Sequence, residues 1–147
     1  MTDADHHDVL PAEAAADHHA LGLQTRRDVL GADYVAHALA QTTAFDADFQ
    51  RFITEGAWGS VWSRPGLAQR ERSMITIALL AALGHHDELA LHVRATRNTG
   101  ATPQDIAEAL MHVAVYAGVP AANHAFKIAK AALASPPADE ETPSATA

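Results

Sequence analysis

Apolar side chains recur along this chain at the spacing of a helix face. Between residues 45 and 53 the large apolar residues stand at positions i, i+4, i+7 and i+8, a spacing that puts them on one side of a helix: Phe45, Phe49, Phe52 and Ile53. Thr43 precedes this segment and is of a residue type that caps helix N-termini. No segment alternates apolar and polar residues as a half-buried strand does. The pattern therefore predicts an all-α fold.

Glycine and proline mark the ends of the predicted helices in the first half of the chain. The segment 26–41 is predicted to form one or two short helices broken near Gly31. Gly56 and Gly59 loosen the end of the phenylalanine-rich helix. Residues 63–66, Ser-Arg-Pro-Gly, then form a predicted turn.

The second half of the chain contains the most apolar predicted helix, over residues 68–83. This helix is apolar nearly all round and ends at Gly84, so we expect it in the centre of the bundle or at a subunit interface. Three more helices follow, whose starts and ends are marked by Asp87 and Gly100, by Thr102 and Gly118, and by Pro120. The whole pattern predicts a compact bundle of about six helices.

The two ends of the chain differ in composition from the part between them. We expect residues 1–24 to form a polar leader that is disordered or weakly helical, residues 25–134 one helical domain, and residues 135–147 a disordered tail. The leader contains four of the ten histidines, which we expect to be exposed to solvent: His6, His7, His18 and His19.

Composition disfavours several functional classes. The chain has no cysteine, which removes disulfides, thiolate metal sites and thiol catalysis and favours the cytoplasm. A formal net charge of -8 disfavours binding to nucleic acid, although a few converging arginines can still bind an anionic substrate. No apolar run is long enough to span a bilayer, and no basic residue precedes Arg26 as a signal peptide would require. We therefore expect no nucleic-acid or membrane partner.

The segment from His85 to His92 carries the most informative titratable side chains. Glu88 and His92 lie four residues apart and share one helix face, where the carboxylate fixes the imidazole tautomer and raises its proton affinity. His85 lies one turn earlier and can join them. The same pair also fits a solvated helix face without function, and His85, Glu88 and His92 could reach one metal ion, although their spacing matches no zinc motif. The residues alone leave these interpretations open.

His112 and Tyr116 repeat the i, i+4 spacing on the next predicted helix. If that helix packs antiparallel against the helix of His92, a polar pocket with several titratable groups results. His112 alone also fits a satisfied core histidine.

Trp58 and Trp62 lie beside the turn that holds Arg64. They form either a hydrophobic plug at the bundle end or an aromatic wall with an arginine that binds a carboxylate. Arg70 and Arg72, near the start of the apolar helix, are either solvated or drawn inward to a similar role.

Four blocks of the chain resemble the γ-carboxymuconolactone decarboxylase family. In the family's order they are Trp-Gly-Ser-Val-Trp-Ser-Arg-Pro-Gly-Leu at 58–67, Arg-Ser-Met-Ile-Thr-Ile-Ala at 72–78, Glu-Leu-Ala-Leu-His-Val-Arg-Ala at 88–95 and Tyr-Ala-Gly-Val-Pro-Ala-Ala-Asn at 116–123. With the Arg-Asp-Val-Leu-Gly segment at 27–31, the blocks cover most of the chain from about Gln24 to Leu133. A generic member of the wider superfamily would share only the Glu/His helix and the glycine after it.

That wider superfamily includes alkylhydroperoxidase-like proteins, which carry Cys-x-x-Cys followed four residues later by His. The matching positions here are His85, Glu88 and His92, so the redox cysteines and any disulfide-based peroxidase chemistry are absent. The resemblance implies an alkylhydroperoxidase-like helical protomer in a homo-oligomer, a trimer or hexamer, with no cofactor and no metal.

The resemblance also implies a reaction: decarboxylation of γ-carboxymuconolactone to 3-oxoadipate enol-lactone, in the protocatechuate branch of the 3-oxoadipate pathway. The protein must then bind the remaining carboxylate, donate hydrogen bonds to the developing oxyanion and protonate the carbanion. We expect His92 to donate the proton, Glu88 to orient it and His85 to act as a second donor. We expect substrate binding by residues on several elements: Arg72, Arg64, Trp62, His112 and Tyr116.

Two other functions fit the same residues. One is a related cofactor-free enzyme acting on another lactone or keto acid. The other is a non-catalytic oligomer that uses the helical scaffold to bind small acids.

Overall fold

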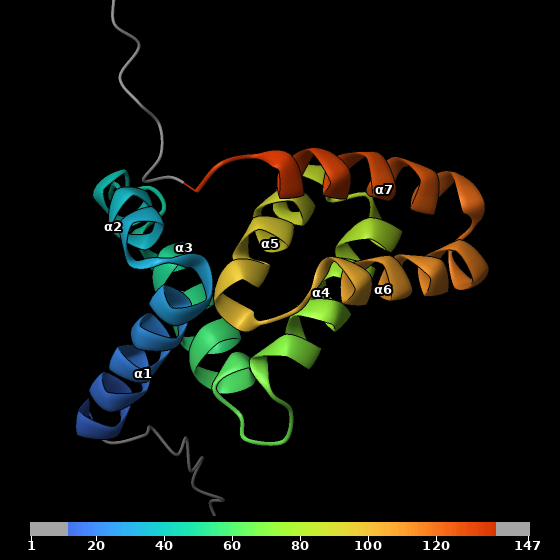
Figure 1. The fold of residues 1–147 in the computed structure, drawn as a ribbon. Coiled ribbons are helices and arrows are strands. Elements are labelled where there is room, and N and C mark those ends of the chain that lie inside the picture. The colour runs from blue at the N-terminus through green and yellow to red at the C-terminus, as the bar shows by residue number, and fades with distance from the viewer. Residues whose placement is uncertain (1–11, 138–147) are drawn as a thin grey trace, which may run out of the picture. The chain divides into compact units, whose positions relative to one another are not determined.

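The computed structural model describes residues 12–137 of the 147-residue chain. Within these residues it contains seven α-helices, one π-helix and no strand, which confirms the predicted all-α class (Figure 1). The chain divides after Gly66 into two compact units. None of the helices in the described part combines the length and hydrophobicity needed to cross a membrane.

The N-terminal unit is built on a long helix, α1 (Ala12–Leu30), which packs along the π-helix η1 (Thr54–Trp62). Two short helices come between α1 and η1 in the sequence. Helix α2 (Ala32–Ala40) contacts α1, and α3 (Ala47–Ile53) leads directly into η1. Gly31 separates α1 from α2 with a φ of 95°, a conformation that favours glycine, so the predicted break is confirmed.

Residues 12–24, expected to be disordered or weakly helical, form most of α1. Tight packing explains this helix. A Cβ atom added to Gly22 would lie 2.2 Å from the carbonyl oxygen of Thr54, so only glycine allows α1 and η1 to approach this closely. His18 and His19, expected in solvent, are half-buried in the same contact. His6 and His7 lie outside the described residues, as does the predicted tail from residue 138 onward.

Two local predictions for this unit were incomplete. Thr43 does not cap the next helix directly but starts a turn before it. The Thr43 amide and hydroxyl both donate to the Asp46 carboxylate, at 2.7 and 3.0 Å, and α3 begins after this turn. The predicted apolar face is not buried within this protomer: Phe45 lies in the turn before α3, and all three phenylalanines are exposed, Phe45, Phe49 and Phe52.

The C-terminal unit contains four helices: α4 (Gln69–Leu83), α5 (His86–Thr99), α6 (Pro103–Tyr116) and α7 (Val119–Ala134). The main contacts are α4 with α5, α6 with α7, α4 with α6 and α5 with α7, and α6 and α7 form an antiparallel hairpin (Figure 1). Their common core is aliphatic and alanine-rich, with no exposed surface on Ile77, Leu89, Val93 and Leu110. Helix α7 ends at Ala134.

Helix ends in this unit form as predicted. Gly84 ends α4 in the left-handed conformation, and the Gly84 and His85 amides donate to the carbonyls of Ala81 and Leu80, the pattern of a Schellman motif. Thr102 caps α6: its hydroxyl accepts from the Asp105 amide at 3.1 Å, and the Asp105 carboxylate accepts from the Thr102 amide at 2.9 Å.

Helix α4 buries one side only. Ile77 and Ala81 belong to the core, whereas Ile75, Leu79 and Leu83 are 50%, 56% and 68% exposed. These three side chains recur every four residues and form one apolar stripe along the helix. Within one protomer the predicted apolar helix is therefore half buried.

Candidate functional site

The three predicted catalytic residues lie at and just after the start of α5. His85 is the residue before the helix, held by the turn at Gly84, and its carbonyl accepts the amide of Leu89 at 2.9 Å. Glu88 lies in the first turn and His92 one turn later, so the spacing predicted from the sequence is present. His85 and Glu88 are exposed, while His92 is half-buried with its Nδ1 atom shielded from solvent. The structure therefore offers one half-buried imidazole, with two exposed polar groups earlier in the same segment.

Burial decides the protonation of His92. The loss of solvation lowers the pKa of His92 from 6.5 to about 4, and the nearby Glu88 carboxylate, which acts in the opposite direction, only partly offsets this. The expected rise in proton affinity is therefore wrong: in the free protein near neutral pH the ring is uncharged. A neutral imidazole can donate one hydrogen bond and accept another, but it acts as an acid only after a nearby anion raises its pKa.

The described part of one protomer brings no three His, Asp or Glu side chains close enough together to hold a metal ion, and this includes His85, Glu88 and His92.

His112 and Tyr116 do not face α5 as the antiparallel arrangement required. Helix α6 packs mainly against α4 and α7, and both side chains are exposed, Tyr116 by 85%. Their rings lie nearly parallel, with centroids 6.1 Å apart. His112 is therefore not a satisfied core histidine, and the pocket predicted between the two helices does not form within one protomer.

The aromatic block ends the N-terminal unit. Trp58 and Trp62 are one turn apart on η1 and buried, with ring centroids 5.2 Å apart at an angle of 32°. Arg64 follows in an exposed turn, and its backbone amide donates to the Val61 carbonyl. The predicted turn is confirmed. The two tryptophans form an aromatic pair, and Arg64 follows Trp62 by two residues in the sequence.

The two arginines of α4 have separate roles. Arg70 holds both oxygens of Asp105, at 2.6 and 2.9 Å, and also Glu71 at 2.7 Å. This arginine holds the pKa of Asp105 down at about 2 and ties α4 to the cap of α6. Arg72 is half-buried. Arg70 is thus committed to Asp105 and Glu71.

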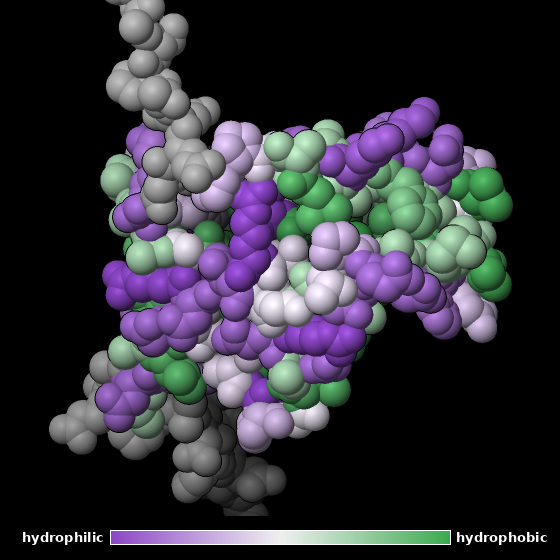
Figure 2. Space-filling view, in the orientation of Figure 1, coloured by the Kyte–Doolittle hydropathy of each residue, from purple (hydrophilic) through white to green (hydrophobic). Residues whose placement is uncertain are grey.

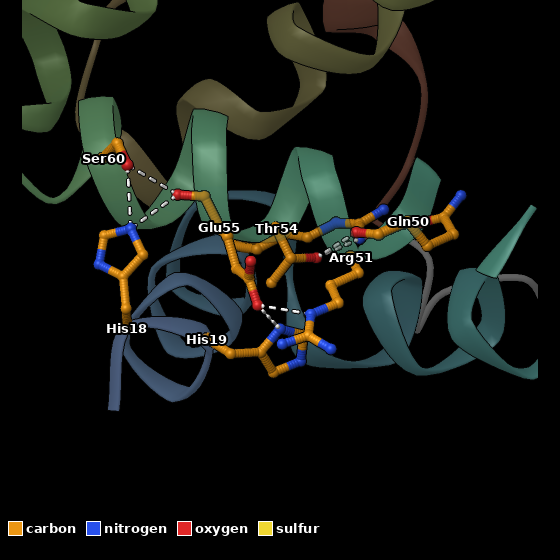
Figure 3. A network of polar contacts seen from close by, with 8 residues as sticks. His18, His19, Gln50, Arg51, Thr54, Glu55 and Ser60 are labelled. Carbon is orange, nitrogen blue, oxygen red and sulfur yellow. Dashed lines mark hydrogen bonds and ion pairs between the residues drawn. The ribbon is translucent and has the colours of Figure 1, made fainter. Parts of the chain in front are cut away.

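Two clusters of polar side chains were not predicted from the sequence. His86 in the first turn of α5 stacks on His124 of α7, with ring centroids 4.1 Å apart. The second cluster surrounds η1, where His18 Nε2 lies 3.1 Å from the Glu55 carbonyl and 2.9 Å from the Ser60 hydroxyl (Figure 3). A π-helix is rare and often marks a functional segment, but its i to i+5 hydrogen bonds leave no simple period in the sequence.

An apolar pocket of about 370 Å³ lies between α6 and α7. Apolar surface is visible over these two helices and at the turn that joins them (Figure 2). The lining residues include none of the predicted site residues: Pro103, Ile106, Ala107, Leu110, Asn123, Phe126, Lys127, Ala129, Lys130 and Leu133. This pocket is therefore separate from the histidines of α5.

Comparison with known proteins identifies the family. Residues 47–131, more than half of the chain, match the model of the carboxymuconolactone decarboxylase family. A 4-carboxymuconolactone decarboxylase of Acinetobacter baylyi is 48% identical over 109 residues, which are 74% of this chain and 81% of that protein. A nitrosuccinic acid decarboxylase of Metarhizium robertsii is 45% identical over 105 residues, 71% of this chain and 73% of that protein. The chain thus belongs to the carboxymuconolactone decarboxylase family.

Proposed function

We propose that this protein decarboxylates γ-carboxymuconolactone to 3-oxoadipate enol-lactone in the protocatechuate branch of the 3-oxoadipate pathway. The observation that carries the proposal is the 48% identity, across most of both chains, to a protein named as that decarboxylase. The second relative is also named as a decarboxylase, which favours an enzyme over a non-catalytic binding protein.

The substrate itself supplies the electron acceptor for this reaction. When the bond to the departing carboxylate breaks, the electron pair stays on the ring carbon and spreads through the ring double bond into the lactone carbonyl. CO2 leaves without a proton, so one proton must be added to the resulting dienolate. The protein's task is to bind the substrate, stabilise the oxyanion and deliver that proton.

The residues of α5 suit the proton delivery. His92 is the proposed donor, Glu88 orients its ring, and His85 is the second donor. His92 is neutral in the free protein because burial lowers its pKa to about 4. The substrate carries two carboxylates, and a negative charge bound close to the ring raises its pKa again. His92 would thus take up a proton from solvent only after the dianionic substrate has bound.

The remaining predicted residues are assigned to substrate binding. Arg72 and Arg64 are the proposed carboxylate ligands, because a guanidinium binds a carboxylate through two parallel hydrogen bonds. Trp62, His112 and Tyr116 are the proposed wall. His112 and Tyr116 are exposed in one protomer, and a wall that excludes water needs a covering surface.

We also propose that the protein is a homo-oligomer, a trimer or hexamer. The apolar stripe on α4, Ile75, Leu79 and Leu83, is exposed, as are Met111 and Val115 on α6. Contiguous apolar side chains on one helix face are typical of a subunit contact. We expect Leu79→Glu to lower the mass measured by light scattering, while the matched control Ala36→Glu on the exposed side of α2 leaves it unchanged. A monomeric wild type would contradict this proposal.

The relative that acts on nitrosuccinic acid supports a second candidate substrate. Nitrosuccinic acid also has two carboxyl groups, and its nitro group can accept an electron pair from the neighbouring carbon. Both reactions therefore need carboxylate binding, a fixed electron acceptor and a proton donor.

One assay separates the two candidates. Wild-type protein is given γ-carboxymuconolactone, generated in situ, or nitrosuccinic acid, and CO2 release and product formation by NMR are compared with the spontaneous rates. We expect faster turnover of the lactone. Turnover of nitrosuccinic acid alone would replace the proposed substrate, and turnover of neither by a folded oligomer would overturn the proposal.

A further inference from the structure

A second pocket lies wholly within the N-terminal unit. It has a volume of about 500 Å³, which falls in the range of small-molecule sites. Its lining comes from α1, from α2 and the loop residue Thr42 that follows it, and from α3 and the start of η1. The apolar part of its lining consists of Leu23, Leu39 and Ala47. The polar part consists of His19, Thr42, Gln50, Arg51 and Thr54. None of these residues belongs to the proposed decarboxylation site.

A buried cation lies directly behind the polar part of this pocket. Arg26 is only 5% exposed, and its Nη1 donates to the Gln50 side-chain oxygen at 3.2 Å and to the Thr54 hydroxyl at 3.3 Å. Both acceptors are neutral, and the Arg26 Nε is buried without a hydrogen-bond partner in the described residues. Burial lowers the pKa of Arg26. A buried charge whose acceptors are all neutral is costly, so this cation is a feature that packing alone does not explain.

The cation fixes the orientation of Gln50. Because the Gln50 side-chain oxygen accepts from Arg26, the amide nitrogen on the same group is left to donate. Thr54 is occupied on both sides, since its hydroxyl accepts from Arg26 and donates to the Gln50 carbonyl at 2.8 Å. Gln50 therefore presents a donor toward the pocket, polarised by a positive charge behind it.

Glu55 orients a second donor of the pocket lining, Arg51. One oxygen of this carboxylate accepts from Arg51 Nε at 2.9 Å and lies 3.3 Å from His19 Nδ1 (Figure 3). Arg51 is thereby oriented through Nε, which leaves its two terminal amino groups to donate elsewhere. The charged groups are two arginines and one carboxylate, so the local balance is positive even when His19 is neutral. In a chain with a net charge of -8 this is a local reversal of sign.

We propose that this pocket is a binding site for a small organic carboxylate, whose charged end is held by Gln50 and Arg51 and whose hydrocarbon part lies against Leu23, Leu39 and Ala47. The donor set has the sign and the geometry that a carboxylate needs, and the apolar lining selects against inorganic anions. The site is independent of the proposed reaction, since it uses other residues and does not require turnover.

Benzoate is the probe, and benzamide is its uncharged match. Calorimetry gives the affinity of the full chain for each probe. Trp62 belongs to the proposed decarboxylation site, so the pocket variants, and not tryptophan fluorescence, assign the binding to this pocket. We expect benzoate to bind to the wild-type full chain and benzamide to bind at least about tenfold more weakly, because the amide lacks the charge.

Three variants localise the binding. Gln50→Glu keeps an oxygen for Arg26 but brings a negative charge to the pocket, so we expect its unfolding midpoint to stay equal or rise while benzoate affinity falls at least about tenfold. Arg51→Gln should also weaken binding. Arg27→Gln, an exposed arginine of α1, is the matched control and should bind as the wild type does. Equal binding of benzoate and benzamide, no benzoate binding by the wild type, or unchanged affinity in both pocket variants would overturn the proposal.

Discussion

The neutral state of His92 makes a quantitative prediction about acid stability. Its folded-state pKa of about 4 lies below the value of 6.5 expected in the unfolded chain. As the pH falls through 6.5, the unfolded chain binds a proton at this residue while the folded chain does not, so acid favours unfolding until the pH reaches the folded-state pKa. Integrating over this window, the free energy of unfolding should fall by about 2 kcal/mol between about pH 7 and about pH 5 because of His92 alone.

The measurement compares wild type with His92→Gln by urea unfolding at several pH values and one fixed protein concentration, since assembly adds a concentration-dependent term. Gln fills a similar volume and does not titrate. The difference in unfolding free energy between the two proteins should change by about 2 kcal/mol over the window, with the variant the less acid-sensitive. His37→Gln, on an exposed histidine of α2, is the control and should follow the wild type. Parallel pH curves for wild type and His92→Gln would refute the argument that burial keeps this imidazole neutral.

Three further predictions concern the elements that hold the C-terminal unit. Gly84→Ala forces a side chain into a φ of 74° and should lower the unfolding free energy by about 1–2 kcal/mol in a urea titration; an unchanged midpoint would argue against the turn that positions His85. Thr102→Ala removes the cap of α6 and should cost about 1 kcal/mol by the same method, whereas Thr102→Ser, which keeps the hydroxyl, should cost much less. Leu110→Ala opens a cavity at a fully buried position and should cost about 3 kcal/mol in calorimetry; a loss below about 1 kcal/mol would contradict the assigned core.

The helix ends could be predicted from sequence because their causes are local. Gly31 and Gly84 adopt positive φ angles that few other residues tolerate, and Thr102 meets its partner Asp105 three residues away. Each signal lies within one turn of the boundary it sets. The all-α class followed from the same short-range pattern.

The structure of the N-terminal unit could not be predicted in this way. The helical state of residues 12–24 depends on contacts with η1, such as the hydrogen bond of His18 with Ser60, 42 positions later in the chain. A polar, alanine-rich segment without apolar period gives no local sign of such a partner. The π-helix was missed for the same reason, since the glycines at 56 and 59 indicated only a loose helix end.

For the candidate site, spacing was predictable and environment was not. The one-turn separation of Glu88 and His92 follows from helix geometry, but the burial of His92 depends on the packing around α5 and reverses the expected direction of its pKa. The pairing of α5 with α4 and α7, rather than with α6, likewise depends on tertiary packing. The role of Arg70 became visible only when Asp105, 35 residues away, was placed beside it.

The central claim is that this chain releases CO2 from γ-carboxymuconolactone with His92 as the proton donor. It is tested most directly by the rate of CO2 release from the in situ generated lactone for wild type, His92→Gln and the control His37→Gln, each checked for folding and assembly. We expect rapid release by wild type and control, and a loss of at least about 100-fold in His92→Gln, the usual contribution of a positioned acid. Release by His92→Gln at the wild-type rate would contradict the assigned donor, and release by none of the three above the spontaneous rate would contradict the reaction itself.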